Sequence, residues 1–207
     1  MVIRHADSAR DGEAIAAIYA PFVTDTPVSF EDVAPTPAEM AARIERLTET
    51  HAWLVAEDGG EILGYAYACP HRERAAYRWA TEVTVYVDPR HQRRGVGRSL
   101  YEALLATLAE RGYRIALAVI ALPNDASVGL HEACGFELVG VCRRIGFKFD
   151  TWWDVGWWQR DLGAWDQLSR IDDQSSSSSS ASVGQASTAR RASPSRSGGT
   201  SDSSMIG

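Results

Sequence analysis

Cysteine and long apolar runs are both scarce in this chain of 207 residues. The three cysteines form no CxxC pair and no even-numbered disulfide framework, as is typical of proteins kept in a reducing cytoplasm. The longest apolar run, residues 115–122, is far shorter than the roughly 20 residues that span a bilayer, and no charged-then-apolar signal segment opens the chain. We therefore expect a soluble cytoplasmic protein with no membrane partner.

Positive charge is also in short supply. The formal net charge is −6, from 21 lysines and arginines against 27 acidic residues. Residues 164–207 carry four acids and four arginines, so the whole excess of −6 lies in residues 1–163. Binding to nucleic acid irrespective of sequence needs a broad basic face. We therefore expect no nucleic-acid partner, and the basic stretch at residues 90–98 is a local feature.

Large apolar residues almost vanish toward the C-terminus. Six consecutive serines, residues 175–180, open a stretch of Ser, Gly, Ala, Thr and Arg. Such a composition cannot bury enough apolar surface to offset the entropy lost on ordering the chain. We therefore expect one folded domain over residues 1–163 and a disordered serine-rich tail over residues 164–207.

Within the predicted domain, segments of strand periodicity alternate with segments of helical periodicity. The strands are expected at residues 2–6, 53–57, 61–68, 78–87, 114–122, 136–147 and 153–162. The helices are expected at residues 9–19, 36–50, 98–111 and 124–134. Pro21 should end the first helix, and the capping box from Thr36 to Glu39 should begin the second. This order indicates an α/β domain around a mixed sheet.

The strand at residues 78–87 carries a carboxylate opposite a row of valines. Side chains alternate between the two faces of a strand. Val83, Val85 and Val87 therefore point one way. Glu82 points the other way, together with Thr84 and Tyr86.

A basic turn with two glycines follows that strand and precedes a helix. The turn, QRRGVG at residues 92–97, matches neither the Walker loop nor the dinucleotide fingerprint, because Gly97 is followed by Arg98 and the third glycine position is Leu100. Glycines at a helix N-terminus let backbone amides approach an anion, and the arginines add charge for a pyrophosphate. The alternative is an ordinary connecting turn with solvated arginines.

Two motifs in order resemble the GNAT superfamily of N-acetyltransferases. The turn resembles its coenzyme A pyrophosphate loop, and residues 124–136 resemble its N-x-x-S-x-x-L-Y-E-x-x-G-F helix. Five segments, which include these motifs in part, together resemble the phosphinothricin and methionine sulfoximine acetyltransferase family: PVSF (27–30), WLVAE (53–57), TVYVDPRHQR (84–93), LPNDASVGLHEACGF (122–136) and GFK with WDVGWWQ (146–159). The resemblance implies a GNAT acyltransferase fold, with a central, mixed, mostly antiparallel twisted sheet flanked by helices.

The resemblance also implies acetyl-CoA as co-substrate, no metal and a homodimer. The strand at residues 85–87 would pair its backbone with the pantetheine arm and polarise the thioester carbonyl, and the turn would hold the pyrophosphate. The implied cofactor-binding residues are Val85, Tyr86, Val87, Arg93, Arg94, Gly95, Val96, Gly97, Arg98, Asn124 and Ser127. Asn124 lies at a helix start, so it is either a cap, a cofactor contact or both.

Two residues are predicted to move protons. Glu82 can accept the proton of the acceptor ammonium directly or through water, and it matches the family's catalytic glutamate; the alternative is a solvated strand carboxylate. His131 stands where the wider superfamily has a tyrosine that protonates the departing thiolate. A histidine can donate or relay that proton, or it packs at the helix edge. Cys134 is interpreted as core packing, and HEACG is not the HExxH zinc motif.

A small amino acid acceptor would need cations for its acidic group and an aromatic wall. The predicted acceptor-binding residues are Phe30, Arg72, Arg74, Tyr77 and Arg78, and each arginine is alternatively a solvated loop charge. The tryptophans at 152, 153, 157 and 158 fit strand core or a subunit interface better than a pocket.

The sequence therefore predicts an acetyl-CoA-dependent N-acetyltransferase of a small amino acid-like acceptor, such as phosphinothricin or methionine sulfoximine or sulfone, acting by direct transfer in a ternary complex. One alternative is acetylation of another small amine or of a protein N-terminus. The other is a coenzyme A-binding regulator without catalysis.

Overall fold

The computed structural model describes residues 1–163, and the expected serine-rich tail lies outside the described residues. Seven strands in this part of the chain form one sheet: β1 (Val2–His5), β2 (Trp53–Asp58), β3 (Glu61–Pro70), β4 (Ala80–Val87), β5 (Ile115–Leu122), β6 (Glu137–Lys148) and β7 (Thr151–Asp161). The α-helices are α1 (Ser8–Thr24), α2 (Pro37–Thr48), α3 (Val96–Glu110) and α4 (Asp125–Ala133), and the short 3₁₀ turns are η1 (Ala75–Tyr77) and η2 (Pro89–His91).

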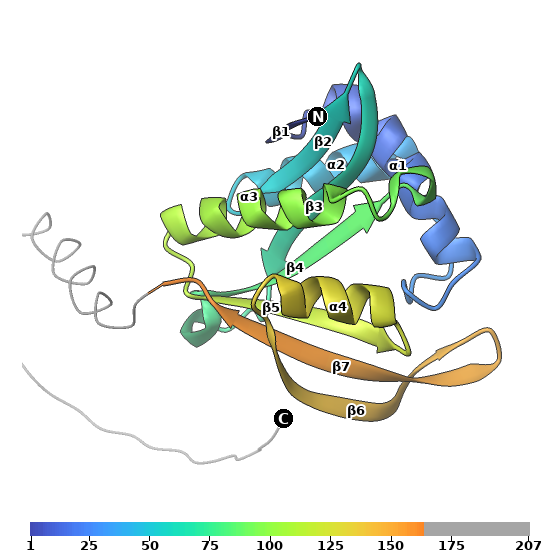
Figure 1. The fold of residues 1–207 in the computed structure, drawn as a ribbon, viewed down its shortest axis with the longest axis vertical. Coiled ribbons are helices and arrows are strands. Elements are labelled where there is room, and N and C mark those ends of the chain that lie inside the picture. The colour runs from blue at the N-terminus through green and yellow to red at the C-terminus, as the bar shows by residue number, and fades with distance from the viewer. Residues whose placement is uncertain (164–207) are drawn as a thin grey trace, which may run out of the picture. The chain divides into compact units, whose positions relative to one another are not determined.

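The sheet is mixed and mostly antiparallel. Its strand order is β1-β2-β3-β4-β5-β7-β6. Every neighbouring pair is antiparallel except β4 and β5, which run parallel. In Figure 1 these two strands lie at the middle of the sheet, with α3 and α4 in front of it. The predicted fold class is confirmed.

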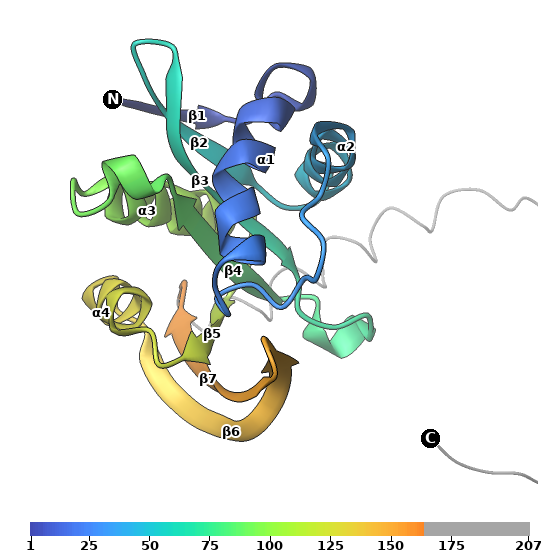
Figure 2. The same ribbon diagram turned by 90° about the vertical axis from the view of Figure 1, so that its right-hand side faces the viewer.

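The helices cover both faces of the sheet. Helices α1 and α2 lie on one side, and α3 and α4 lie on the other (Figure 2). Leu100, Leu104 and Leu108 of α3 are fully buried in one apolar cluster, whereas Ile15 of α1 and Ile44 of α2 are buried in the other. No helix within residues 1–163 is both long and apolar enough to cross a membrane.

The two clusters confirm the predicted alternation along β4. Val83 is buried on the α3 side, with Val85 and Val87 packed against the same cluster. Tyr86 belongs to the cluster of α1 and α2. Glu82 has the parity of Tyr86, so it lies on the face covered by α1 and α2.

Pro21 does not end the first helix, contrary to the sequence prediction. Helix α1 continues through Pro21 to Thr24. Proline removes one helical hydrogen bond, but the last turn buries Val23, which is 1% exposed, and the amide of Asp25 still bonds the carbonyl of Pro21 at 3.0 Å. Tertiary burial therefore outweighs the local preference. The predicted capping box of α2 is confirmed, because the side chains of Thr36 and Glu39 each bond the other's backbone amide.

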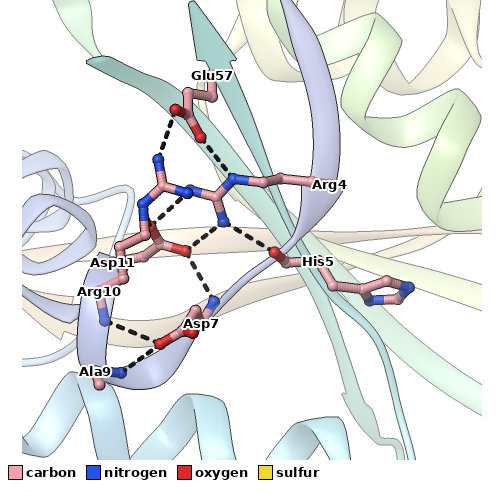
Figure 3. Close-up of polar contacts among 7 residues, drawn as sticks. All are labelled: Arg4, His5, Asp7, Ala9, Arg10, Asp11 and Glu57. Atoms are coloured by element: carbon pink, nitrogen blue, oxygen red, sulfur yellow. Dashed lines mark hydrogen bonds and ion pairs between the residues drawn. The ribbon is translucent and has the colours of Figure 1, made fainter. Parts of the chain in front are cut away.

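A buried carboxylate joins β1, α1 and β2. Asp11 is 1% exposed and accepts two hydrogen bonds of 2.7 Å from Arg4. Arg4 also bonds Glu57 at 2.6 Å, and Glu57 in turn binds Arg10 (Figure 3). Burial alone would raise the pKa of Asp11, but the bonds from Arg4 and from the amide of Asp7 outweigh burial and hold that pKa below its usual value.

Candidate active site

The parallel strands β4 and β5 separate after a short paired stretch. They pair only where Ala80–Glu82 meets Ile115–Leu117, although both strands run on for about five residues, and their arrows point apart in Figure 1. β5 is paired along its whole length by β7. On the side of β4 that faces β5, backbone N–H and C=O groups of residues 83–87 therefore form no hydrogen bond to a neighbouring strand. We call the region between the diverging ends of β4 and β5 the splay. A ligand lying there can form hydrogen bonds with these backbone groups.

The glycine turn opens α3 at the end of β4. Gly95 has a φ of +82° and Arg93 a φ of +60°, so the turn uses the left-handed region twice within three residues. The first helical bond runs from the amide of Ser99 to the carbonyl of Gly95. The preceding amides of α3 therefore have no helical acceptor and suit an anion.

The arginines of this turn are exposed. Arg94 contacts the ring of His91 at 3.0 Å, and Arg98 donates to Glu102 at 2.8 Å. The arginines themselves are exposed, so they can exchange these partners for a phosphate at small cost.

Gly97 brings the two sequence motifs into contact. A Cβ at this position would lie 3.1 Å from a methyl of Leu130 in α4 and 3.4 Å from a methyl of Val87 in β4. The start of α3, the end of β4 and one face of α4 therefore meet at a residue without a side chain. This close approach explains why the turn carries glycine there.

Asn124 caps α4. Its side-chain oxygen accepts from the amide of Ser127 at 3.1 Å, which is the cap role that the sequence left open. The same helix carries His131, which is 4% exposed. The structure thus places Asn124, Ser127 and His131 on one short helix beside the glycine turn.

Both ring nitrogens of His131 are engaged within the fold. Nδ1 lies 2.7 Å from the carbonyl oxygen of Ser127, which can only accept, so Nδ1 carries the proton. Nε2 then accepts from the hydroxyl of Tyr101 at 2.7 Å. Burial lowers the pKa of His131 more than the Ser127 carbonyl raises it. These contacts are those of the packing alternative, and the acid role stays a prediction.

Glu82 is the last residue of β4 in the parallel pairing, so it stands where the splay begins. Its Oε1 lies 2.8 Å from Nδ1 of His71, which directly follows β3. Sequence reasoning missed His71 because it regarded residues 70–76 as a polar loop. The antiparallel register could have found it, since Cys69 lies opposite Glu82 and the next residue but one is His71.

A cavity of about 340 Å³ lies between the α1–α2 connection and the strands that border the splay. Its lining residues are Tyr19, Val28, Ser29, Phe30, Glu31, Tyr86, Val119, Ala121 and Val155. Val119 is 42% exposed because it faces this space, so β5 is not buried throughout, as its apolar sequence had suggested. Phe30 is the one predicted acceptor-binding residue that lines this cavity.

The other predicted acceptor residues lie on the β3–β4 connection and are exposed. The ring of Tyr77 meets the ring of His71 edge-on at 5.5 Å, which brings Tyr77 near Glu82. The guanidinium of Arg78 lies 5.1 Å from the ring of Trp79. For Arg72 and Arg74 the structure shows no charged partner within residues 1–163.

A buried lysine holds the α1–α2 connection in place. Lys148, at the end of β6, donates to the carbonyls of Val23 and Ser29 at 2.6 Å and of Glu31 at 2.9 Å. Burial lowers its pKa, and the carboxylates of Asp32 and Glu31 oppose that shift. Sequence reasoning missed this role because a lysine at a strand end resembles an ordinary surface charge. The ring of Phe30, in the segment that Lys148 fixes, packs on Gly146 of β6.

A mixed sheet that splays between its two parallel strands, with a glycine turn opening the next helix, defines an acyltransferase of the GNAT class. The chain belongs to the acetyltransferase (GNAT) family, whose sequence model matches residues 15–136. Within residues 1–163, no group of three or more histidine, cysteine or acidic side chains is placed to hold a metal ion.

Three of the proteins similar to this chain are named for the amino acid analogues that they acetylate. The chain is 45% identical over 155 residues to a phosphinothricin N-acetyltransferase of Streptomyces viridochromogenes, covering 75% of this chain and 85% of that protein. It is 34% identical to an L-methionine sulfoximine/L-methionine sulfone acetyltransferase of Salmonella typhimurium, covering 78% and 95%. A phosphinothricin acetyltransferase from Sinorhizobium meliloti, solved with acetyl-CoA, superposes with a TM-score of 0.75 at 36% identity, covering 78% and 88%. The predicted family is confirmed.

Proposed function

We propose that this enzyme transfers the acetyl group of acetyl-CoA to the amino group of a small amino acid-like acceptor, with phosphinothricin and methionine sulfoximine or sulfone as representative acceptors. The family and the names of the relatives support this reaction. The splay between β4 and β5 is the structural feature that supports this reaction most directly. An unused backbone edge on β4 leads from a carboxylate, Glu82, to an anion-binding turn at the start of α3.

The proposed cofactor site runs along that edge. Backbone groups of Val85 and Val87 would pair with the pantetheine arm, and Tyr86 would lie between them. The turn, Arg93 to Arg98, would hold the pyrophosphate through its free amides and arginine side chains. Asn124 and Ser127 lie at the start of α4, which reaches the turn through the contact of Leu130 with Gly97.

In the proposed reaction, Glu82 takes one proton from the acceptor ammonium. The nitrogen lone pair then attacks the thioester carbonyl carbon, and the C–S bond breaks as the amide C–N bond forms. An amide of β4 stabilises the developing oxyanion. The thiolate leaves with the bonding electron pair and takes up one proton, while the nitrogen loses its second proton as the amide forms. We propose that His131 relays this proton from the nitrogen to the thiolate.

The acceptor is proposed to bind between Phe30 and the β3–β4 connection. Phe30 lines the cavity beside Tyr86, so it can cover the apolar part of an acceptor. Arg72, Arg74 and Arg78, with Tyr77, lie on the connection that also carries His71, and their cations suit a carboxylate or phosphinate. Acetylating such toxic analogues would give a cell resistance to them.

We propose a homodimer formed through the β6–β7 hairpin. Apolar side chains are exposed along this hairpin: Leu138, Val139, Val141, Ile145, Phe147, Phe149 and Trp152. Exposed apolar side chains gathered on one hairpin suit an interface between subunits. We expect Ile145→Glu, at a side chain that is 62% exposed, to convert a dimer into a monomer in analytical ultracentrifugation. A monomeric parent protein would contradict the proposal.

We place this enzyme in the cytoplasm, where acetyl-CoA is available and where its cysteines, all free in the described residues, stay reduced. Neither nucleic acid nor a membrane enters the proposed reaction.

A thiol-release assay over a panel of acceptors tests the proposed function. Phosphinothricin, methionine sulfoximine, methionine sulfone, ordinary amino acids and N-terminal peptides are each added with acetyl-CoA. We expect release with the amino acid analogues. Release with peptides or other amines alone would favour the alternative acceptors. Binding of acetyl-CoA without release for any amine would favour a regulator.

A further inference from the structure

Glu82, the proposed base, has a hydrogen-bond partner just beyond the neighbouring strand β3. Nδ1 of His71 lies 2.8 Å from Oε1 of Glu82. The side chain of His71 is 13% exposed, and that of Glu82 is 28% exposed. The pair is therefore largely shielded from water, and its hydrogen bond is stronger than one at the surface.

Aromatic rings from two other elements fix the imidazole. Tyr77 of η1 meets it edge-on at 5.5 Å, and Trp157 of β7 meets it edge-on at 6.0 Å. Edge-to-face contacts in this range are favourable. The ring is thus held from the β3–β4 connection and from across the splay, which gives it one orientation relative to Glu82.

The hydrogen-bonding chemistry of Glu82 and His71 shows which of the two carries the shared proton. An ionised carboxylate can only accept hydrogen bonds, so Nδ1 of His71 is the donor. This bond occupies Oε1 of Glu82, whereas Oε2 has no hydrogen-bond partner in the described part of the chain. Oε2 is therefore the oxygen that remains available for an acceptor ammonium.

We propose that His71 is a positioning residue for Glu82: its Nδ1–H holds Oε1 so that Oε2 points toward the acceptor nitrogen. This inference rests on the proposed function, because it gives Glu82 the role of base. We therefore expect kcat to depend more on the Nδ1–H donor of His71 than on the bulk of its ring. A carboxylate that rotates freely would spend most of its time in unproductive orientations.

Two substitutions distinguish the effect of the Nδ1–H donor from the effect of the aromatic ring. His71→Phe keeps a ring between Tyr77 and Trp157 but has no donor. His71→Asn loses the ring, and its amide nitrogen can donate from nearly the position of Nδ1. We expect kcat to fall about tenfold or more in His71→Phe and to stay within about threefold in His71→Asn, with the KM for acetyl-CoA unchanged in both. His5→Asn, at an exposed residue of β1, serves as the matched control.

A double-mutant cycle with Glu82→Gln completes the experiment. A positioning residue acts only through its carboxylate, so we expect His71→Phe to cost little further activity in the Glu82→Gln background. Equal losses in the Asn and Phe variants, or losses that multiply in the double variant, would show a structural role and overturn the proposal. So would an unaltered kcat in His71→Phe.

The cycle also keeps the two hypotheses apart. If Glu82→Gln alone leaves kcat unaltered, the assignment of the base fails. If Glu82→Gln loses activity but His71→Phe does not, only the positioning role of His71 fails.

Discussion

At the scale of the residue, the side chains of the proposed site find their partners on other elements of the fold. Glu82 is held by a residue that follows another strand, and His131 is bonded to Tyr101 of α3. Lys148 reaches three carbonyls more than a hundred positions away. A site assembled in this way owes its geometry to the sheet as much as to its own residues.

His131→Phe tests the proposed proton relay. This change removes the imidazole and leaves the Tyr101 hydroxyl without its acceptor in the core, which costs on the order of 1–3 kcal/mol. As a proton relay, His131 should also contribute to turnover, so we expect kcat to fall at least about tenfold in protein that is still folded at the assay temperature. The measurement pairs steady-state kinetics with thermal melting. A lower Tm with an unaltered kcat would leave His131 only its packing role.

Local patterns predicted some of these residues and not others. Glu82 and the glycines of the turn could be predicted because strand parity and a strand-to-helix turn are local features. His71 and Lys148 could not, because their roles depend on register and on the path of the α1–α2 connection. Their neighbours in sequence show neither the carboxylate nor the carbonyls that they bind.

At the scale of the element, the turn between β4 and α3 depends on a backbone conformation that favours glycine. Gly95 adopts φ +82° and has no atoms within 4 Å of an added Cβ, so a substitution there strains the backbone without a clash. Gly59, in the β2–β3 turn, is matched to it, with φ +57° and equally open surroundings. The two positions therefore differ in their place relative to the proposed cofactor.

The pair Gly95→Val and Gly59→Val tests the turn. Acetyl-CoA at about a hundred times its Kd stabilises a single-site protein by about 2.7 kcal/mol, which is roughly 5–10 °C in Tm for a domain of this size. Both substitutions should lower the Tm of the free protein. We expect Gly59→Val to keep the full ligand shift and Gly95→Val to lose most of it. A full shift in Gly95→Val would remove the turn from the cofactor site.

The α1–α2 connection depends on β6 for its position. Lys148→Met leaves buried carbonyls without a donor, so we expect a lower Tm and a displaced Phe30. The KM for the acceptor should rise about tenfold, while the KM for acetyl-CoA, whose proposed site lies along β4 and the glycine turn, should change less than twofold. Steady-state kinetics with each substrate varied separately would show this. Equal changes in both KM values would mean that Lys148 supports the whole domain and not the acceptor side alone.

Whether a segment forms a helix or a strand was largely predictable, because most segments show a clear helical or strand periodicity or a recognisable helix cap. The alternating strand β4 and the capping box of α2 followed from sequence alone. The end of α1 did not, since burial of Val23 outweighs the effect of Pro21. The splay could not be predicted from local pattern either. It follows from the short stretch over which β4 and β5 pair.

At the scale of the whole domain, acid stability should depend on paired carboxylates. The pKa of Asp11 is lowered in the folded protein, as is that of Glu31 beside Arg43. A lowered folded pKa means that the unfolded chain binds more protons at acid pH. This stabilisation is fully present above the unfolded value of about 4 and is lost as pH falls through the folded value.

Equilibrium unfolding in urea between about pH 6 and pH 2.5 measures this dependence. We expect the free energy of unfolding to fall with decreasing pH below about 4, with each group contributing at most about 1.4 kcal/mol per pH unit. Asp11→Asn keeps the shape of the side chain and removes its titration. This variant should be less stable near neutral pH and should lose less stability on acidification. A wild-type slope in Asp11→Asn would contradict this origin of the acid sensitivity.

In the proposed reaction, Glu82 at the start of the splay takes the proton from the acceptor amine. The most direct test is kcat of Glu82→Gln with a saturating acceptor at neutral pH, since glutamine has nearly the same shape and cannot act as the base. We predict a fall of about a hundredfold or more, with the KM for acetyl-CoA unchanged and the protein folded. A kcat within twofold of the parent enzyme would mean that Glu82 is not the base.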